Sequence, residues 1–217
     1  MKDVIFDFDG TLIDANVATL RAIQIALDEN AVRYNPAVLA PGLLSFSREE
    51  IVAKLGLADR LDLARSVLMR AVQIRATDTK GAGAFYPGIK SLLHALKDGG
   101  RNIYIATNNF KPVIDMSLKV LDINIFNDVR TSDYNGEYLT KNSMVLDLVV
   151  THKMAPAETA MVGDSMVDID AGRVAGINTI AVAWGHDSDQ VALKKSADFY
   201  VKNTKPLREI LLSSRVL

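Results

Sequence analysis

Short apolar runs that alternate with amphipathic stretches are the feature that most constrains the fold of this sequence. Four runs have the length and the aliphatic composition of β-strands, at residues 4–8, 101–107, 159–163 and 178–183. Helical spacing of apolar residues follows the later strands, at residues 112–121, 142–153 and 167–175. Strands that alternate with helices pair in parallel and are covered on both faces. The pattern therefore predicts an α/β fold with a parallel sheet.

The segment between the first strand and the rest of this pattern has a different character. Residues 16–30, 47–57 and 60–74 all show helical spacing, and no run between them has the alternation of a strand. The segment begins after Asp14 and ends in a Gly-rich stretch near Gly83. We therefore predict a core domain made of residues 1–14 and 84–217, and a small all-helical domain of residues 15–83 inserted after the first strand.

Composition narrows the classes of function. A chain of 217 residues with 49% hydrophobic content can bury a large core, and its net charge of −1 creates no field that would attract nucleic acid or a membrane. The absence of cysteine excludes disulfides and thiolate catalysis. The sequence starts with a strand-like run and not with the pattern of a signal peptide, and no apolar stretch has membrane-spanning length. Both features favour a cytoplasmic protein. We expect a monomer or homodimer that acts on a small molecule.

Polar side chains follow three of the predicted strands. In an open, Rossmann-like parallel sheet, ligands bind beyond the carboxyl ends of the strands, so the residues at these ends form one crevice. Acids, hydroxyls, an amide and glycine N–H groups gather there: Asp7, Asp9, Gly10, Thr11, Thr107, Asn108, Gly163, Asp164 and Ser165. The sequence therefore predicts a functional crevice at this edge of the sheet.

Carboxylates crowded into one crevice raise one another's pKa unless a cation neutralises them, and oxygen ligands favour Mg²⁺. Mg²⁺ commonly shares a phosphate oxygen with carboxylates, so the crevice is predicted to handle phosphate. Such a site also needs a fixed positive charge. Lys141, at the start of a helical stretch, is the first candidate, and Lys111 and Lys153 are the alternatives. A carboxylate that is free to attack phosphorus could form an aspartyl phosphate.

Four short segments give the chain a resemblance to phosphatases of the haloacid dehalogenase superfamily. The stretch DFDGTL at residues 7–12 resembles the first motif of that superfamily, and Thr107-Asn108 the second. Lys141 matches the third motif, and VGDSMVDIDAG at residues 162–172 the fourth. YPGIKSLLHALKDGG and AVAWGHDSDQVALKKSADFYV are similar to phosphoglycolate phosphatases and their close relatives.

The resemblance implies a role for each matching residue. Asp7 would be the nucleophile and a Mg²⁺ ligand. Asp9 would be general acid and then general base, with its backbone carbonyl on the metal. Asp164 would complete the metal site, and Asp168 would orient a metal-bound water or Lys141. Substrate phosphate would be bound by Gly10, Thr11, Thr107, Asn108 and Lys141, of which Thr107 and Lys141 would also take part in catalysis.

The resemblance also implies that residues 15–83 form a helical cap that closes over small substrates. Arg48 in this segment is either a contact for substrate phosphate or carboxylate, or an ordinary solvated arginine. The sequence departs from the phosphoglycolate phosphatase pattern at two places, which leaves the substrate open. Asn109 stands where a lysine often follows Thr-Asn, and Lys141 is followed by Asn142-Ser143 without a proline.

We therefore predict a Mg²⁺-dependent phosphomonoesterase that hydrolyses a small phosphorylated metabolite, phosphoglycolate or a sugar phosphate, through a phospho-aspartate. One alternative is a phosphomutase of the β-phosphoglucomutase type, because FSREE in the insert resembles that group. Another is a non-enzymatic, receiver-like switch, which also places acids, a hydroxyl and a lysine around a phosphorylated aspartate. The insert and Asp9 count against the switch.

Overall fold

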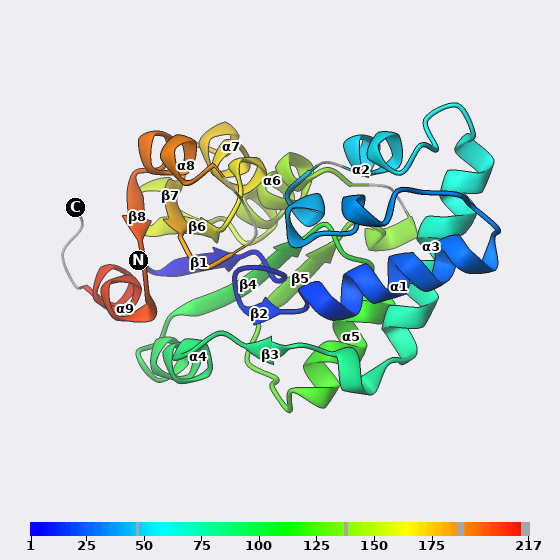
Figure 1. The fold of residues 1–217 in the computed structure, drawn as a ribbon. Helices are drawn as coiled ribbons and strands as arrows, with labels where there is room; N and C mark the ends of the chain where they lie inside the picture. Colours follow the sequence, from blue (N-terminus) through cyan, green and yellow to red (C-terminus); the bar gives the residue numbers. More distant parts are fainter. Residues whose placement is uncertain (47, 137–138, 186–188, 214–217) are drawn as a thin grey trace. The chain divides into compact units, whose positions relative to one another are not determined.

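The computed structural model describes residues 1–46, 48–136, 139–185 and 189–213. Its main feature is a six-stranded parallel sheet (Figure 1). The strands in spatial order are β5 (Asp128–Thr131), β4 (Asn102–Thr107), β1 (Asp3–Phe6), β6 (Thr159–Gly163), β7 (Asn178–Val182) and β8 (Phe199–Val201). Every residue of β1 and β6 is buried, as expected for central strands covered on both faces.

Helices lie on both faces of this sheet. Figure 1 shows α6 (Lys141–Thr151), α7 (Met166–Val174) and α8 (Gln190–Ser196) along one face, and α4 (Ile89–Asp98) and α9 (Thr204–Leu212) along the other. On the first face, Met144 and Leu148 pack in one buried apolar cluster with Ile5 and Met161 of the sheet. The predicted α/β fold with a Rossmann-like sheet is confirmed.

The direction of strand addition reverses at β1. This strand pairs in parallel with β4 on one side and with β6 on the other, so that Phe6 lies beside both Ile105 and Val162. In open parallel sheets, ligands bind at such a switch point, beyond the carboxyl ends of the strands. The segments that leave β1, β4 and β6 therefore emerge at the same edge of the sheet.

By its internal contacts, the chain divides into two compact units: Met1–Asp14, Ala84–Lys111 and Ile123–Leu217 form the first, and Ala15–Gly83 with Pro112–Asp122 the second. In the second unit, α1 (Asn16–Glu29) and α3 (Leu61–Thr77) pack around a core that includes Leu27 and Val67. The other α-helices here are α2 (Arg48–Lys54) and most of α5 (Lys111–Val120). The role of residues 15–83 as a cap remains a prediction.

Short elements complete the chain. Antiparallel β2 (Ile13–Asp14) and β3 (Ala84–Phe85) form a two-stranded sheet in the first unit. Single turns of 3₁₀-helix occur at η1 (Pro36–Val38), η2 (Pro41–Ser45), η3 (Thr79–Gly81), η4 (Tyr134–Gly136) and η5 (Pro156–Glu158). In the described part of the chain, no helix is long and apolar enough to cross a membrane.

The first strand is shorter than the sequence predicts, because it ends at Phe6 and not at Phe8. The N–H groups of Leu12 and Ile13 both donate to the carbonyl of Phe8, which bends the chain into a tight turn. Strands β5 and β8 were missed because they are short and mix polar with apolar residues, as in the Asp-Val-Arg-Thr of β5. The other predicted strands and helices differ from the structure by three residues at most at either end.

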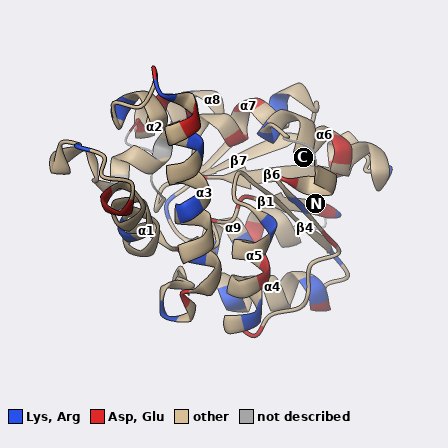
Figure 2. Cartoon of the chain, turned by 90° about the vertical axis from the view of Figure 1, so that its right-hand side faces the viewer, with Lys and Arg blue, Asp and Glu red and all other residues tan. Residues whose placement is uncertain are grey.

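Charges of both signs are intermixed on the described surface. Figure 2 shows lysine or arginine together with aspartate or glutamate on several helices, among them α2 and α5. Helix α4, for example, carries Lys90, Lys97 and Asp98. This distribution agrees with the formal net charge of −1.

Candidate active site

The turn after β1 brings Gly10 against Asp164. The N–H of Asp7 donates to the carbonyl of Val162 at 2.9 Å, so the chain stays beside β6 before it turns. Gly10 has a φ of +86°, and a Cβ added there would lie 2.5 Å from Asp164 Oδ2. Only glycine combines this backbone conformation with so close an approach. Because Gly10 of the first motif has no side chain, it leaves space for the Asp164 carboxylate.

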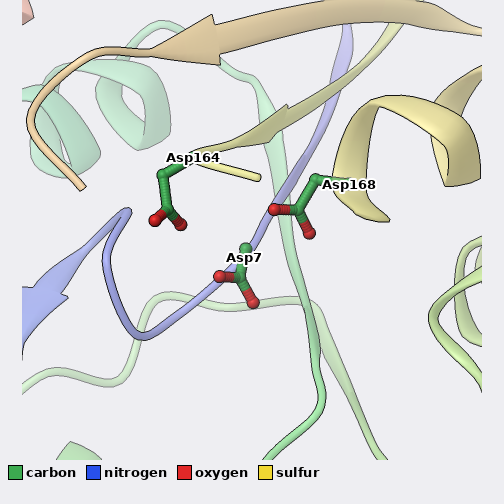
Figure 3. A group of neighbouring side chains, drawn as sticks. All are labelled: Asp7, Asp164 and Asp168. Carbon is green, nitrogen blue, oxygen red and sulfur yellow. The ribbon is translucent and has the colours of Figure 1, made fainter. Parts of the chain in front are cut away.

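Three buried carboxylates meet at the carboxyl ends of β1 and β6. One oxygen of each of Asp7, Asp164 and Asp168 lies within 4.8 Å of the others (Figure 3). We call this group the acidic cluster. A Cβ at Gly163 would collide with the Asp168 side chain, and a Cβ at Gly185 with that of Asp164. Both carboxylates therefore pack directly on glycine backbone.

Lys141 enters the acidic cluster from the first position of α6. Its Nζ lies 2.6 Å from Asp7 Oδ1 and 2.9 Å from Asp168 Oδ1, and it donates to the carbonyl of Ala106 at 2.9 Å. Thr140 caps the helix N-terminus in a reciprocal capping box with Ser143. Lys153, an alternative considered from sequence, lies beyond the opposite end of this helix.

The charges in the cluster do not balance. Burial raises the pKa of Asp7 well above its ordinary value, Lys141 lowers it in part, and Asp168 and Asp164 raise it further. Burial alone would lower the pKa of Lys141, but the carboxylates of Asp168 and Asp7 outweigh this and raise it. Within the acidic cluster of described residues, the three carboxylates when ionised and the one ammonium sum to two negative charges. A divalent cation with oxygen ligands therefore fits the site in charge and in donor type.

Hydroxyl and indole groups orient two of these carboxylates. Ser165 donates to Asp168 Oδ2 through its N–H at 3.2 Å and its Oγ at 2.7 Å, while Oδ1 faces Lys141. Thr11 Oγ1 donates to Asp164 Oδ1 at 3.1 Å. The indole Nε1 of Trp184 in turn donates to the carbonyl of Thr11 at 3.1 Å. These contacts leave the carboxylates little freedom to rotate.

The segment after β4 forms the other side of the site. Thr107 is buried, and its Oγ1 accepts a hydrogen bond from the N–H of Asn109 at 3.2 Å. Ser132, which follows β5, donates through Oγ to the carbonyl of Asn108 at 3.0 Å. The side-chain Nδ2 of Asn109 donates to Asp9 Oδ2. The second motif is therefore linked to the first through Asn109 and Asp9.

The predicted site residues outside the insert all lie in the first unit, around the ends of β1, β4 and β6 and the starts of α6 and α7. Arg48 is the first residue of α2 in the second unit, and its role remains a prediction. Sequence analysis missed Ser132 and Trp184. Recognising β5 would have identified Ser132 by the strand-end rule. Nothing in the local sequence signals that the Trp184 indole reaches Thr11.

Comparison with known proteins agrees with this arrangement. The sequence profile of haloacid dehalogenase-like hydrolases matches residues 4–182. The chain is 28% identical to phosphoglycolate phosphatase from Synechococcus elongatus, over 95% of each chain. It is 26% identical to the pyrophosphatase PpaX from Bacillus pumilus, over 97% of this chain and 96% of that one.

Among solved structures, a haloacid dehalogenase-like family protein from Streptococcus pneumoniae superposes with a TM-score of 0.79 at 22% identity. The alignment covers 95% of this chain and 96% of that protein. The parallel sheet is that of a Rossmann-like α/β protein, with the acidic cluster at the carboxyl ends of β1 and β6. The chain belongs to the haloacid dehalogenase-like hydrolase family, as the profile match shows. The predicted resemblance and the predicted hydrolase class are thereby confirmed.

Proposed function

We propose that this chain is a Mg²⁺-dependent phosphomonoesterase that hydrolyses a small phosphorylated metabolite, phosphoglycolate or a sugar phosphate, through a phospho-aspartate on Asp7. The main support for the proposal is the set of charged groups around Asp7. Its carboxylate is 2.6 Å from the ammonium of Lys141 and belongs to a cluster of three acids that needs further positive charge. A phosphoryl dianion bound at a divalent cation and an ammonium is the matching substrate group.

In the proposed reaction, an oxygen of Asp7 attacks phosphorus, and the bond from phosphorus to the ester oxygen breaks. Asp9 gives its proton to the leaving oxygen, so the products of this half-reaction are an alcohol and an aspartyl phosphate. Asp9, now a carboxylate, then takes a proton from water as the water oxygen attacks phosphorus and the bond from phosphorus to the Asp7 oxygen breaks. Free phosphate leaves, and Asp7 and Asp9 return to their starting states.

The remaining residues bind and orient the transferring group. Lys141 is buried beside Asp7 and is held charged by Asp7 and Asp168, so its ammonium can contact a phosphoryl oxygen. Asp7, Asp164 and the backbone carbonyl of Asp9 would hold Mg²⁺, which when bound supplies positive charge to stabilise the phosphoryl oxygens. Further donors to the phosphate are assigned to Gly10, Thr11, Thr107 and Asn108. Asp168 would position Lys141 or a water molecule.

Two curated relatives support the substrate class, since one is named a phosphoglycolate phosphatase and the other a pyrophosphatase. Both act on phosphate compounds, and each covers nearly all of this chain. The cytoplasmic location, and the monomer or homodimer that the sequence favours, are part of the same proposal.

The test is release of phosphate from a panel of small phosphate compounds. Wild type and Asp7→Asn are assayed on 2-phosphoglycolate, sugar phosphates, pyrophosphate and nucleotides, each with Mg²⁺ or with EDTA. We expect Mg²⁺-dependent release by wild type alone, while Asp7→Asn keeps the thermal transition of a folded protein. Full activity of Asp7→Asn would refute the nucleophile assignment.

The same samples distinguish the two alternatives. A phosphomutase would convert a sugar phosphate to its isomer without releasing phosphate. A receiver-like switch would leave Asp7 phosphorylated for hours, whatever compound is supplied. Either result would replace the phosphatase proposal.

Arg48 needs a separate test because it lies in the second unit. We propose that it contacts the substrate, so Arg48→Ala should raise KM for the best substrate. Arg70→Ala is the control, because Arg70 belongs to the same unit and is half-exposed in an ion pair with Glu29. If KM for Arg48→Ala equals that of the control, Arg48 is an ordinary surface arginine.

A further inference from the structure

Asn109 contacts Asp9, the proposed proton donor. Its side-chain amide Nδ2 donates a hydrogen bond to Asp9 Oδ2, joining residues 100 positions apart in the sequence. The contact is partly buried, and it lies within the first compact unit. It links the turn after β1 directly to the turn after β4.

The backbone of Asn109 is held on both sides of this side chain. Its N–H donates to Thr107 Oγ1 at 3.2 Å. Its carbonyl accepts from the N–H of Ser132 at 3.0 Å and from Ser132 Oγ at 3.2 Å. Ser132 is 1% exposed, so this anchor belongs to the packed interior. An amide fixed in this way can hold the carboxyl group it contacts in one orientation.

The hydrogen-bonding capacity of the Asn109 amide bears on which oxygen of the Asp9 carboxyl group carries the proton. The NH₂ group of asparagine only donates, so Asp9 Oδ2 must accept. In a protonated carboxyl group the carbonyl oxygen is the better acceptor, so this contact favours the proton on the other oxygen, Oδ1. When this proton has left, the N–H of Asn109 remains as a donor to the carboxylate.

We infer that Asn109 is a positioning residue that holds the Asp9 carboxyl group so that Oδ1 transfers the proton to the leaving oxygen. In that step the bond from Oδ1 to hydrogen breaks and the O–H bond of the product alcohol forms. The inference rests on the proposed function, in which Asp9 is the general acid. It adds the residue that sets the orientation of the acid.

The experiment compares two leaving groups. An alkyl phosphate releases a basic alkoxide that needs a proton, whereas 4-nitrophenyl phosphate releases a stable phenolate that needs none. Asn109→Leu removes the donor and keeps the number and branching of the side-chain heavy atoms. We expect kcat/KM for the alkyl ester to fall by about 10-fold or more, and that for the aryl ester by less than about 3-fold. The parameter kcat/KM is used because it includes the departure of the leaving group.

Ser132→Ala is the matched control. It removes a hydroxyl that anchors the same turn and leaves the side chain of Asn109 in place. A general loosening of the turn should lower kcat/KM for both esters by the same factor. Thermal transitions are recorded for all variants. Should Asn109→Leu fold poorly, Asn109→Ser carries the same comparison.

Asp9→Asn separates failure of the inference from failure of the proposed function. If it shows the selective loss on the alkyl ester and Asn109→Leu does not, Asp9 remains the acid and the inference about Asn109 is wrong. If Asp9→Asn shows no selectivity, the assignment of Asp9 is wrong. Equal losses on both esters in Asn109→Leu would also overturn the inference.

Discussion

The ammonium of Lys141 lies 2.6 Å from the carboxylate of Asp7, although 134 residues separate them in the sequence. Both side chains are buried, and Asp168 lies 2.9 Å from the same ammonium. One cation therefore holds together two acids that come from different elements. We therefore expect substitutions at this site to change both catalysis and stability.

Lys141→Met should impair catalysis and folding together. The substitution keeps the length of the side chain but removes the only ammonium contact recorded for Asp7 among the described residues. We expect kcat to fall by about 100-fold or more, because the transferring group loses a fixed charge. Removing one partner of a buried pair should also lower the free energy of unfolding by about 3 kcal/mol. Steady-state kinetics and chemical denaturation measure the two effects.

Lys153→Met is the control, since Lys153 lies after the opposite end of α6. It should change neither quantity measurably. An unimpaired kcat in Lys141→Met would show that the ammonium does not act on the transferring group.

Asp7→Asn should stabilise the metal-free protein at neutral pH. The folded pKa of Asp7 is raised, mainly by burial and by two neighbouring carboxylates. A raised carboxyl pKa contributes stability below the unfolded pKa, near 4, and this contribution is lost as pH rises through the folded pKa. In EDTA, the thermal midpoint of Asp7→Asn should exceed that of wild type at about pH 7.5 and approach it at about pH 4.5.

Asp170→Asn is the matched control for this pH series, because Asp170 lies in α7 beside Asp168 in sequence but is exposed. Its midpoint should follow that of wild type throughout. If the difference in thermal midpoint between Asp7→Asn and wild type increased toward acid pH, the upward direction assigned to the pKa shift of Asp7 would be wrong.

Mg²⁺ should stabilise wild type but not Asp164→Asn. The three carboxylates and Lys141 leave two unbalanced negative charges, which a divalent cation would neutralise. A ligand at about 100 times its Kd raises the free energy of unfolding by about 2.7 kcal/mol. Denaturation with Mg²⁺ and with EDTA measures this difference.

A second readout is fluorescence of Trp184, the single tryptophan, which reaches Asp164 through Thr11. We expect saturable quenching or enhancement on Mg²⁺ addition in wild type only. Equal stabilisation of Asp164→Asn would place the metal elsewhere.

Gly10→Ala should weaken metal binding more than Gly100→Ala does. Both glycines have positive φ, so each substitution costs about 1 kcal/mol in backbone strain. A Cβ at Gly10 would also press on Asp164, whereas a Cβ at Gly100 has no neighbour within 4 Å. Calorimetric titration with Mg²⁺ should show at least about 10-fold weaker binding for Gly10→Ala. Equal affinities in the two variants would mean that Asp164 adjusts freely.

Much of the fold was predictable because local sequence patterns indicate most of its strands and helices. The stretches that became β4 and β6 each join a run of apolar residues to a polar end, so both the strand and its predicted functional terminus are visible in the sequence. Strand β5 was not predicted, because Asp128 and Arg130 make two of its four residues charged. Their ion-pair partners, His152 and Asp147, are distant in the sequence. With β5 unrecognised, the anchor that Ser132 provides for the second motif could not be foreseen.

The sequence alone predicted that Asp7, Asp9 and Asp164 lie at one edge of the sheet, since strand ends converge in any open parallel sheet. It also predicted Lys141, at a helix start, as the cation of this site. Tertiary structure decided the contacts among them. The hydrogen bonds from Asn109 to the Asp9 carboxylate and from Trp184 to the Thr11 carbonyl join residues 100 and 173 positions apart, and no local pattern indicates such a pairing. Their geometry depends on the register and packing of whole strands, so only the folded chain determines which oxygen of each carboxylate is held and which faces the crevice.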